Sequence, residues 1–302
     1  MTTTLLVPGS QKGADLMVAA VKGRSLWDDA RRRLFRNRAA VAGMLVLALL
    51  VVAAVVGPYL APYSYDAINK NDVWVPPLTN GHLLGTDSLG RDLLARLLTG
   101  LRVSLAIGLV ATGVSLVIGV AWGAVAGFVG GRLDEAMMRI VDVLYSLPFI
   151  FFVILLMVTF GSNIILIFVA IGAVEWLTMS RIVRGQTLTL KHKEFVEAAR
   201  AAGLDQGAII TRHIVPNLLG PVVVYVTLTI PAVILAESFL SFLGLGVQPP
   251  MASLGTLIAN GAQDMELAWW LLVFPSLLMI VTLMCFNFIG DGLRDALDPK
   301  DR

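Results

Sequence analysis

The longest polar island in the last two thirds of the chain is Arg181–Pro221, with the sequence RIVRGQTLTLKHKEFVEAARAAGLDQGAIITRHIVPNLLGP. Long apolar runs precede and follow it, so it leaves a membrane and re-enters the membrane from the same side. Residues Lys193–Ala202 are good helix formers, and Gly203 fits a left-handed C-cap. Asp205 is placed to N-cap a second helix, which Pro216 would end. The segment therefore predicts a helix, a sharp turn and a second helix on the membrane surface.

The first of these helices is rich in alanine. It contains Ala198, Ala199, Ala201 and Ala202. Such small side chains bury little surface and let another backbone approach closely, so we interpret the helix as a docking element for a soluble partner. The alternatives are an ordinary surface helical hairpin and a DNA-binding helix-turn-helix, where similar spacing of alanine and glycine is common. The membrane spans on both sides argue against the DNA-binding class.

The composition is that of an integral membrane protein of the all-α class. Hydrophobic residues make up 57% of the chain and charged residues 15%, far from the balance of a soluble domain. A charge-poor segment of about 20 residues can cross a bilayer as a helix. We expect six such helices, at Ala39–Leu60, Val103–Phe128, Val143–Phe160, Ile164–Val183, Leu218–Gly244 and Leu267–Ile289.

The lysines and arginines predict the orientation, because they are enriched in cytoplasmic loops. If the N-terminus lies inside, all 23 of them lie inside except Lys70, Arg91, Arg96 and Arg102. Both termini and the polar segment are then cytoplasmic. The same asymmetry accounts for the formal net charge of +2, which needs no nucleic-acid partner. The single cysteine, Cys285, lies in the sixth span and can form no internal disulfide.

The long outside loop contains charges at spacings near three and four. They are Asp87, Arg91, Asp92 and Arg96, within the amphipathic stretch Leu83–Leu105. The pattern predicts a helix from Arg91 onward, whose charges either pair along one face or contact a substrate-delivering protein outside.

The second span carries a face of small residues. Gly119, Gly123 and Gly127 form Gly-x-x-x-Gly twice over. Such a face lets membrane helices approach closely, either within the chain or against a partner subunit.

Acidic residues inside the spans are costly and usually face a bundle interior or a wet cavity. Glu175 lies in the fourth span, Glu237 in the fifth, and Asp142 at the cytoplasmic start of the third. Glu175 and Glu237 either line a translocation path or make structural hydrogen bonds between helices. Prolines inside spans, which kink helices, are Pro148, Pro221 and Pro231.

Catalytic motifs are missing from the sequence. It has no P-loop of the G-x-x-x-x-G-K-[ST] type, no H-E-x-x-H helix and no G-x-S-x-G elbow. We therefore predict no catalytic residue, metal site or cofactor on this chain.

The polar segment resembles the EAA loop of ATP-binding-cassette (ABC) importer permeases. The pattern of that loop is Glu-Ala-Ala, three residues, Gly, nine residues and Ile-x-Leu-Pro. Matching positions hold Glu197, Ala198, Ala199, Gly203 and Pro216, whereas His213 replaces the Ile and Val215 the Leu. In that family the loop is a coupling helix in a cleft of the ATP-hydrolysing subunit. The resemblance implies coupling residues at Glu194, Glu197, Ala198, Ala199, Arg200, Gly203, Leu204 and Pro216.

Further segments are similar to the C-type permease subunit of bacterial oligopeptide and dipeptide ABC importers. They are Phe35–Leu47, Leu84–Leu98, Gly130–Phe149, Glu237–Pro250 and Phe286–Lys300. The stretches LGTD and FLGLGVQPP are typical of the peptide and nickel group, and RIVRGQTLTLK and CFNFIGDGLRDALDPKDR are most similar to oligopeptide systems.

The resemblance implies a type I ABC importer permease fold with six transmembrane helices and a cytoplasmic coupling helix. The expected organisation is a cytoplasmic segment 1–38, a first span 39–61, a periplasmic loop 62–102 with an amphipathic helix, a five-helix core 103–290 that includes the coupling loop 184–217, and a cytoplasmic tail 291–302.

The implied function is ATP-driven import of oligopeptides across a bacterial inner membrane. The implied partners, besides membrane lipid, are a sister B-type permease, two ATPase subunits that use ATP and Mg, and a periplasmic or lipid-anchored peptide-binding protein. The alternatives are a dipeptide, nickel or other small-solute permease of the same group, an ion-coupled secondary transporter using Glu175 and Glu237, and a membrane scaffold.

Overall fold

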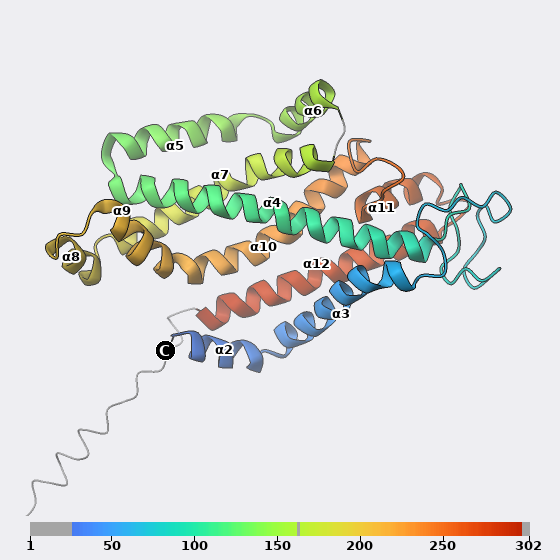
Figure 1. The fold of residues 1–302 in the computed structure, drawn as a ribbon, viewed down its shortest axis with the longest axis horizontal. Coiled ribbons are helices and arrows are strands. Elements are labelled where there is room, and N and C mark those ends of the chain that lie inside the picture. Colours follow the sequence, from blue (N-terminus) through green and yellow to red (C-terminus); the bar gives the residue numbers. More distant parts are fainter. Residues whose placement is uncertain (1–25, 162–163, 298–302) are drawn as a thin grey trace, which may run out of the picture.

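A computed structural model of the protein describes residues 26–161 and 164–297 (Figure 1). Residues 1–25 of the predicted cytoplasmic segment and 298–302 of the predicted tail lie outside the described residues. Within the described part, the chain is helical, and the only strand-like pairings are the isolated bridges Thr79–His82 and Thr86–Asp92.

The helices follow one another along almost the whole described chain. They are α2 (Leu26–Arg36), α3 (Arg38–Leu60), α4 (Leu93–Val129), α5 (Gly131–Ser146), α6 (Phe149–Phe160), α7 (Ile164–Leu190), α8 (Glu194–Ala201), α9 (Gln206–Ile209), the π-helical segment η1 (Ile210–Ile214), α10 (Val215–Phe242), α11 (Leu254–Gln263) and α12 (Trp270–Leu297).

Five of these elements are long and apolar enough to cross a membrane: α3, α4, α7, α12 and the continuous run from α9 through α10. The helices α5 and α6 make a sixth span if the bent pair is counted as one. In Figure 1, α4 packs along α7 and α10, and α10 in turn packs along α12. One end of the bundle carries the loop 61–92 and α11, and the other end carries α2, α8 and α9. We call these the loop end and the α8 end.

The third predicted span, Val143–Phe160, is not one helix. It is broken between α5 and α6, whose axes bend by 81°. Leu147 has an extended backbone (φ −74°, ψ 132°), and Pro148 is the N-cap residue of α6. A residue that precedes proline is pushed out of the α region, which ends α5 at this point.

The polar stretch 130–139, which follows α4, is largely helical. Gly130 and Gly131 have φ of 73° and 59° and form the turn between α4 and α5. The chain is already in α5 from Gly131 onward. The connection between α4 and α5 is therefore a two-glycine turn.

The Gly-x-x-x-Gly face of α4 packs against α7 of the same chain. A Cβ placed on Gly119 would lie 2.5 Å from Cβ of Met179, and one on Gly127 would lie 2.8 Å from Cβ of Thr187. The glycine face therefore packs within the chain, against α7, and not against another subunit.

The amphipathic helix predicted in the outside loop is not a separate element. It is the loop-end portion of α4, which begins at Leu93 after the N-cap residue Asp92. A carboxylate oxygen of Asp92 accepts a hydrogen bond from the Ala95 amide (2.8 Å). The predicted start of the helix, Arg91, therefore lies two residues before the observed start, Leu93.

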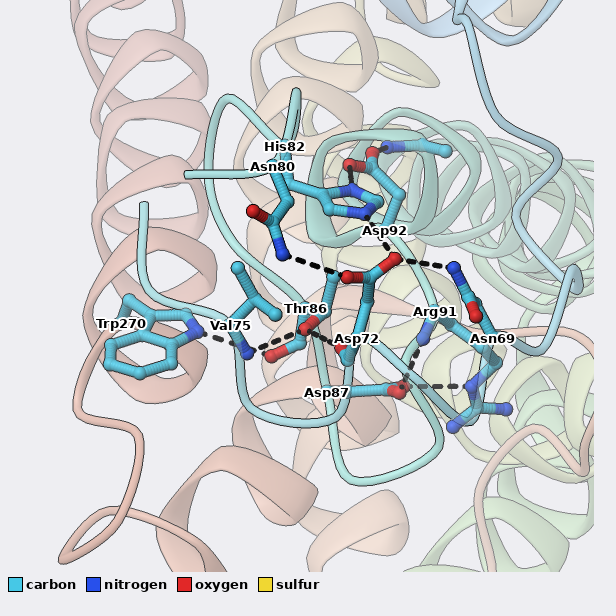
Figure 2. Close-up of polar contacts among 11 residues, drawn as sticks. Asn69, Asp72, Val75, Asn80, His82, Thr86, Asp87, Arg91, Asp92 and Trp270 are labelled. Carbon is cyan, nitrogen blue, oxygen red and sulfur yellow. Dashed lines mark hydrogen bonds and ion pairs between the residues drawn. The ribbon is translucent and has the colours of Figure 1, made fainter. Parts of the chain in front are cut away.

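The loop before α4 is held by buried polar contacts (Figure 2). Thr86 Oγ1 accepts a hydrogen bond from the Val75 amide (2.8 Å), and the indole N–H of Trp270 in α12 donates to the Thr86 carbonyl (3.2 Å). His82 lies 2.8 Å from Asp92 through Nδ1 and stacks on Tyr63. These contacts fasten the loop to the first turn of α4 and to the start of α12.

Candidate functional site

The helix α8 ends in a glycine-capped turn, as the sequence predicts. Gly203 has φ of 82°, its amide donates to the Arg200 carbonyl (2.9 Å), and the Leu204 amide donates to the Ala199 carbonyl (3.2 Å). This pair of bonds is the Schellman arrangement, which satisfies carbonyls left free at a helix end. The first turn of α8 carries Glu194 and Glu197, whose charges suit the positive end of the helix dipole.

The two faces of α8 differ. Val196 and Ala199 are buried and pack in one apolar cluster with Phe128 of α4, Val183 of α7 and Leu218 of α10. The opposite surface is exposed; it comprises Glu194, Phe195, Glu197, Ala198, Arg200, Ala201, Ala202 and Gly203. One side of the helix thus belongs to an apolar cluster shared with three spans, and the other side is exposed.

Two cationic side chains fasten this region to the end of α4. The guanidinium of Arg200 lies over the Phe128 ring, 5.1 Å from its centroid. Lys191, just after α7, donates from Nζ to the Gly127 carbonyl (3.1 Å). The sequence placed Arg200 among the coupling residues, but it gave no sign of these two contacts.

The second predicted helix begins as expected and ends differently. Asp205 N-caps α9, since its carboxylate accepts a hydrogen bond from the Ala208 amide (3.1 Å). Pro216 does not end the helix, because α9 continues through η1 into α10. The Val215 amide donates to the Ile210 carbonyl, five residues back. A π-helical turn of this kind shifts the hydrogen-bond register just before a residue that has no amide N–H.

Ion pairs between α5 and α7 were missed by sequence reasoning. Arg184 binds Asp134 through Nε (2.5 Å) and Nη2 (2.6 Å), and Arg181 binds Asp142 through Nη2 (2.8 Å). Arg181 also lies 4.3 Å from the centroid of the Tyr145 ring. The only sequence signal for these pairs is that acidic and basic residues gather at the same ends of neighbouring spans.

Glu175 lines a cavity, whereas Glu237 is enclosed. Glu175, in α7, is half-buried and borders a cavity of about 320 Å³ together with Tyr145 and Phe152 of α5 and α6. Glu237, in α10, is 0% exposed, and its Oε1 accepts hydrogen bonds from Ser241 (2.7 Å) and Ser253 (2.6 Å). The two carboxylates border no common cavity among the described residues. Glu237 Oε2 is buried and has no hydrogen-bond partner in the described part of the chain. A path-lining role for Glu175 or Glu237 stays a prediction.

Two family models match the chain. The model described as "Binding-protein-dependent transport system inner membrane component" matches residues 95–302. The model described as "N-terminal TM domain of oligopeptide transport permease C" matches residues 25–77. Together they cover the α8 region and the first span.

Curated relatives match over almost their whole length. The oligopeptide transport system permease protein OppC of Haemophilus influenzae is 52% identical, with 100% of both chains covered. OppC of Escherichia coli K12 is 55% identical, with 93% of this chain and 94% of that protein covered. The dipeptide transport system permease protein DppC of Bacillus subtilis is 46% identical, with 92% and 87% covered.

Among solved structures, the chain is similar to a chain of the MetNI methionine ABC transporter in an inward-facing conformation. The TM-score is 0.55 at 19% identity, and the match covers 67% of this chain and 96% of that chain. This likeness concerns the fold alone. The chain therefore belongs to the family of binding-protein-dependent transport system inner membrane components, has the type I ABC importer permease fold, and is a multi-pass membrane protein.

Proposed function

We infer that this chain is the C-type permease subunit of an ATP-driven importer of oligopeptides. In this proposal it pairs with a related B-type permease and with two ATPase subunits that use ATP and Mg. A periplasmic or lipid-anchored peptide-binding protein delivers the substrate. Both termini and α8 lie in the cytoplasm, and the loop end lies outside.

The observation that carries the proposal is the contrast between the faces of α8. Its exposed face carries Glu194, Glu197 and small alanines, which suit close packing against a cleft in an ATPase subunit. Its buried face, Val196 and Ala199, shares an apolar cluster with α4, α7 and α10. A displacement of α8 would therefore be passed to the spans through this shared cluster and through α9 and η1, which α8 contacts.

In the proposed cycle, ATP-driven closure of the ATPase pair displaces α8. The spans that share the apolar cluster of α8 then move the path from inward-facing to outward-facing, and the binding protein releases peptide into it. ATP hydrolysis and release of the products restore the inward-facing state. The chain itself performs no chemistry. Among the described residues, we propose that Glu175 lines the path.

The oligopeptide class is supported by the OppC relatives at 52% and 55% identity. A dipeptide substrate is the second candidate, because a DppC protein is 46% identical to this chain. Nickel and other small solutes carried by the same group are outcomes of the test.

The test is uptake into proteoliposomes that contain the chain with its sister permease, the ATPase subunits and the binding protein. We expect ATP-dependent uptake of peptides longer than dipeptides, with neither uptake nor ATP hydrolysis by the chain alone. Preference for dipeptides or for nickel would move the substrate to those classes. Uptake by the lone chain driven by an ion gradient would contradict the proposal and favour a secondary transporter.

A further inference from the structure

Two arginines at the loop end share one carboxylate. Asp87 Oδ2 accepts a hydrogen bond from Arg91 Nε at 2.7 Å and lies 3.5 Å from Arg96 Nε. The other oxygen of Asp87 accepts the amides of Leu89 and Arg91, both at 2.9 Å. One carboxylate for two guanidinium groups leaves one formal positive charge without a partner in this cluster.

Arg96 is poorly compensated for a buried cation. It is 3% exposed, and its Nε makes no hydrogen bond within the described part of the chain. Its Nη1 donates to the Tyr65 carbonyl at 3.3 Å. Burying a charge is costly unless the charge is paired and hydrogen-bonded, so an anion that reaches Arg96 would be bound favourably.

A cavity of about 150 Å³ adjoins both arginines. Its polar and charged lining is Arg91, Arg96, Ser241, Gln248, Thr256 and Asn260. No acidic side chain is among the described residues that line it. The cavity therefore combines cationic groups with neutral hydrogen-bonding groups and lacks a competing carboxylate.

A second cavity, of about 300 Å³, lies against the same two arginines and Asn260. It differs because Asp87 and Asp264 line it. Any anion is therefore expected in the smaller cavity, between the loop that follows α10 and the helix α11.

We propose that the smaller cavity binds the C-terminal carboxylate of the transported peptide, with Arg96 and Arg91 as the cationic groups. This inference rests on the proposed peptide-import function. Guanidinium groups bind planar carboxylates well through parallel hydrogen bonds. One water needs about 10–15 Å³ of such accessible space, so 150 Å³ holds a carboxylate with part of its terminal residue.

Arg96 is 3% exposed, so a carboxylate can reach its guanidinium only through the cavities that it lines. An acidic side chain of a docking protein would have to enter the same space, and the test below separates that occupant from a peptide end. A chain terminus is narrow and can enter such a cavity.

The experiment measures binding of two probes, tri-alanine and tri-alanine amide, to the complete importer without its binding protein in lipid nanodiscs. Saturation-transfer NMR gives both dissociation constants. The variants are Arg96→Gln, which removes the charge, and Ala259→Leu, which fills the cavity from a lining position; Ala259 is 8% exposed. The matched control is Arg102→Gln, because Arg102 is an exposed arginine of the same helix that lines neither cavity.

We expect the acid to bind at least about tenfold more tightly than the amide, ~1.4 kcal/mol, in the wild type and in Arg102→Gln. The preference should fall below about twofold in Arg96→Gln and in Ala259→Leu. If the importer that carries Arg96→Gln cannot be isolated as a complex, the result for Ala259→Leu alone tests the proposal.

Three results would overturn the proposal. The first is equal or absent binding of the two probes by the wild type, and the second is a preference for the acid that survives in Ala259→Leu. The third is an Arg96→Gln variant that keeps the preference for the acid but loses affinity for the binding protein. The last result would assign the cavity to an acidic side chain of that protein. ATP-driven uptake of tri-alanine by the wild type tests the import function separately. Uptake without an acid preference would therefore contradict the carboxylate site alone.

Discussion

The guanidinium of Arg200 lies 5.1 Å from the centroid of the Phe128 ring, and this contact joins the exposed helix α8 to the last turn of α4. Phe128 is itself buried in the cluster that holds Val196 of α8. The contact therefore links a surface helix to the span that packs along both α7 and α10.

Weakening this contact should reduce coupling more than stability. A cation over an aromatic ring contributes about 0.5–1 kcal/mol at an exposed site. We expect Phe128→Leu and Arg200→Gln each to lower the peptide imported per ATP hydrolysed, with the double variant no worse than the poorer single one. Arg212→Gln is the control, since Arg212 is an exposed arginine of η1. Additive losses in the double variant would show that the two residues act separately.

Gly203 should be sensitive to backbone conformation and insensitive to side-chain volume. Its φ is 82°, and a Cβ there would meet no atom within 4 Å. Gly203→Val should therefore cost about 1–2 kcal/mol of left-handed strain and weaken retention of the ATPase subunits about 5–30-fold at normal membrane levels. Gly203→Asn, which tolerates this conformation, should retain them nearly as the wild type does. Equal retention by both variants would show that the capped turn does not shape the docking surface.

The packing of α4 on α7 should tolerate no side chain at Gly123. A Cβ there would lie 2.8 Å from Cβ of Val183 and 2.9 Å from the amide nitrogen of Arg184. We expect Gly123→Ala to destabilise the folded permease by about 1–3 kcal/mol through overpacking, measured by thermal unfolding in detergent. Gly113→Ala in the same helix is the control, because a Cβ at Gly113 meets nothing within 4 Å. Unchanged stability of Gly123→Ala would mean that the two helices separate more easily than their packing implies.

Local features of the fold could be predicted from the sequence, because short segments determine them. The turn at Gly203 and the N-cap at Asp205 follow from backbone chemistry within a few residues, and both are confirmed. The apolar lengths of the spans are likewise local. The prediction that Pro216 ends the second helix was wrong. A π-helical turn just before this proline shifts the hydrogen-bond register, and the helix continues past it.

Long-range pairings could not be predicted. Arg184 lies 50 residues from Asp134, and Trp270 lies 184 residues from Thr86. Sequence spacing carries no information on which distant groups meet. The same limit applies to the candidate site: the alanines of α8 were visible, but the burial of Ala199 beside exposed Ala198 depends on where α4 and α10 end.

The orientation predicted from lysine and arginine remains to be measured. In a Cys285→Ser background, a single cysteine replacing exposed Lys70 should react with a membrane-impermeant thiol reagent added outside intact cells. One replacing exposed Gln206 should react only after the membrane is opened. Labelling of position 206 from outside would reverse the topology and remove α8 from the side of the ATPase subunits.

The proposed coupling requires the exposed face of α8 to contact an ATPase subunit. The most direct measurement places a photo-cross-linking amino acid at Ala201 in one protein and at Lys70 in another, both at exposed positions. After irradiation of membranes that contain the complete importer, adducts are identified by mass spectrometry. We expect an ATPase-subunit adduct from position 201 and none from position 70. An adduct from position 70 with none from position 201 would contradict the proposed coupling.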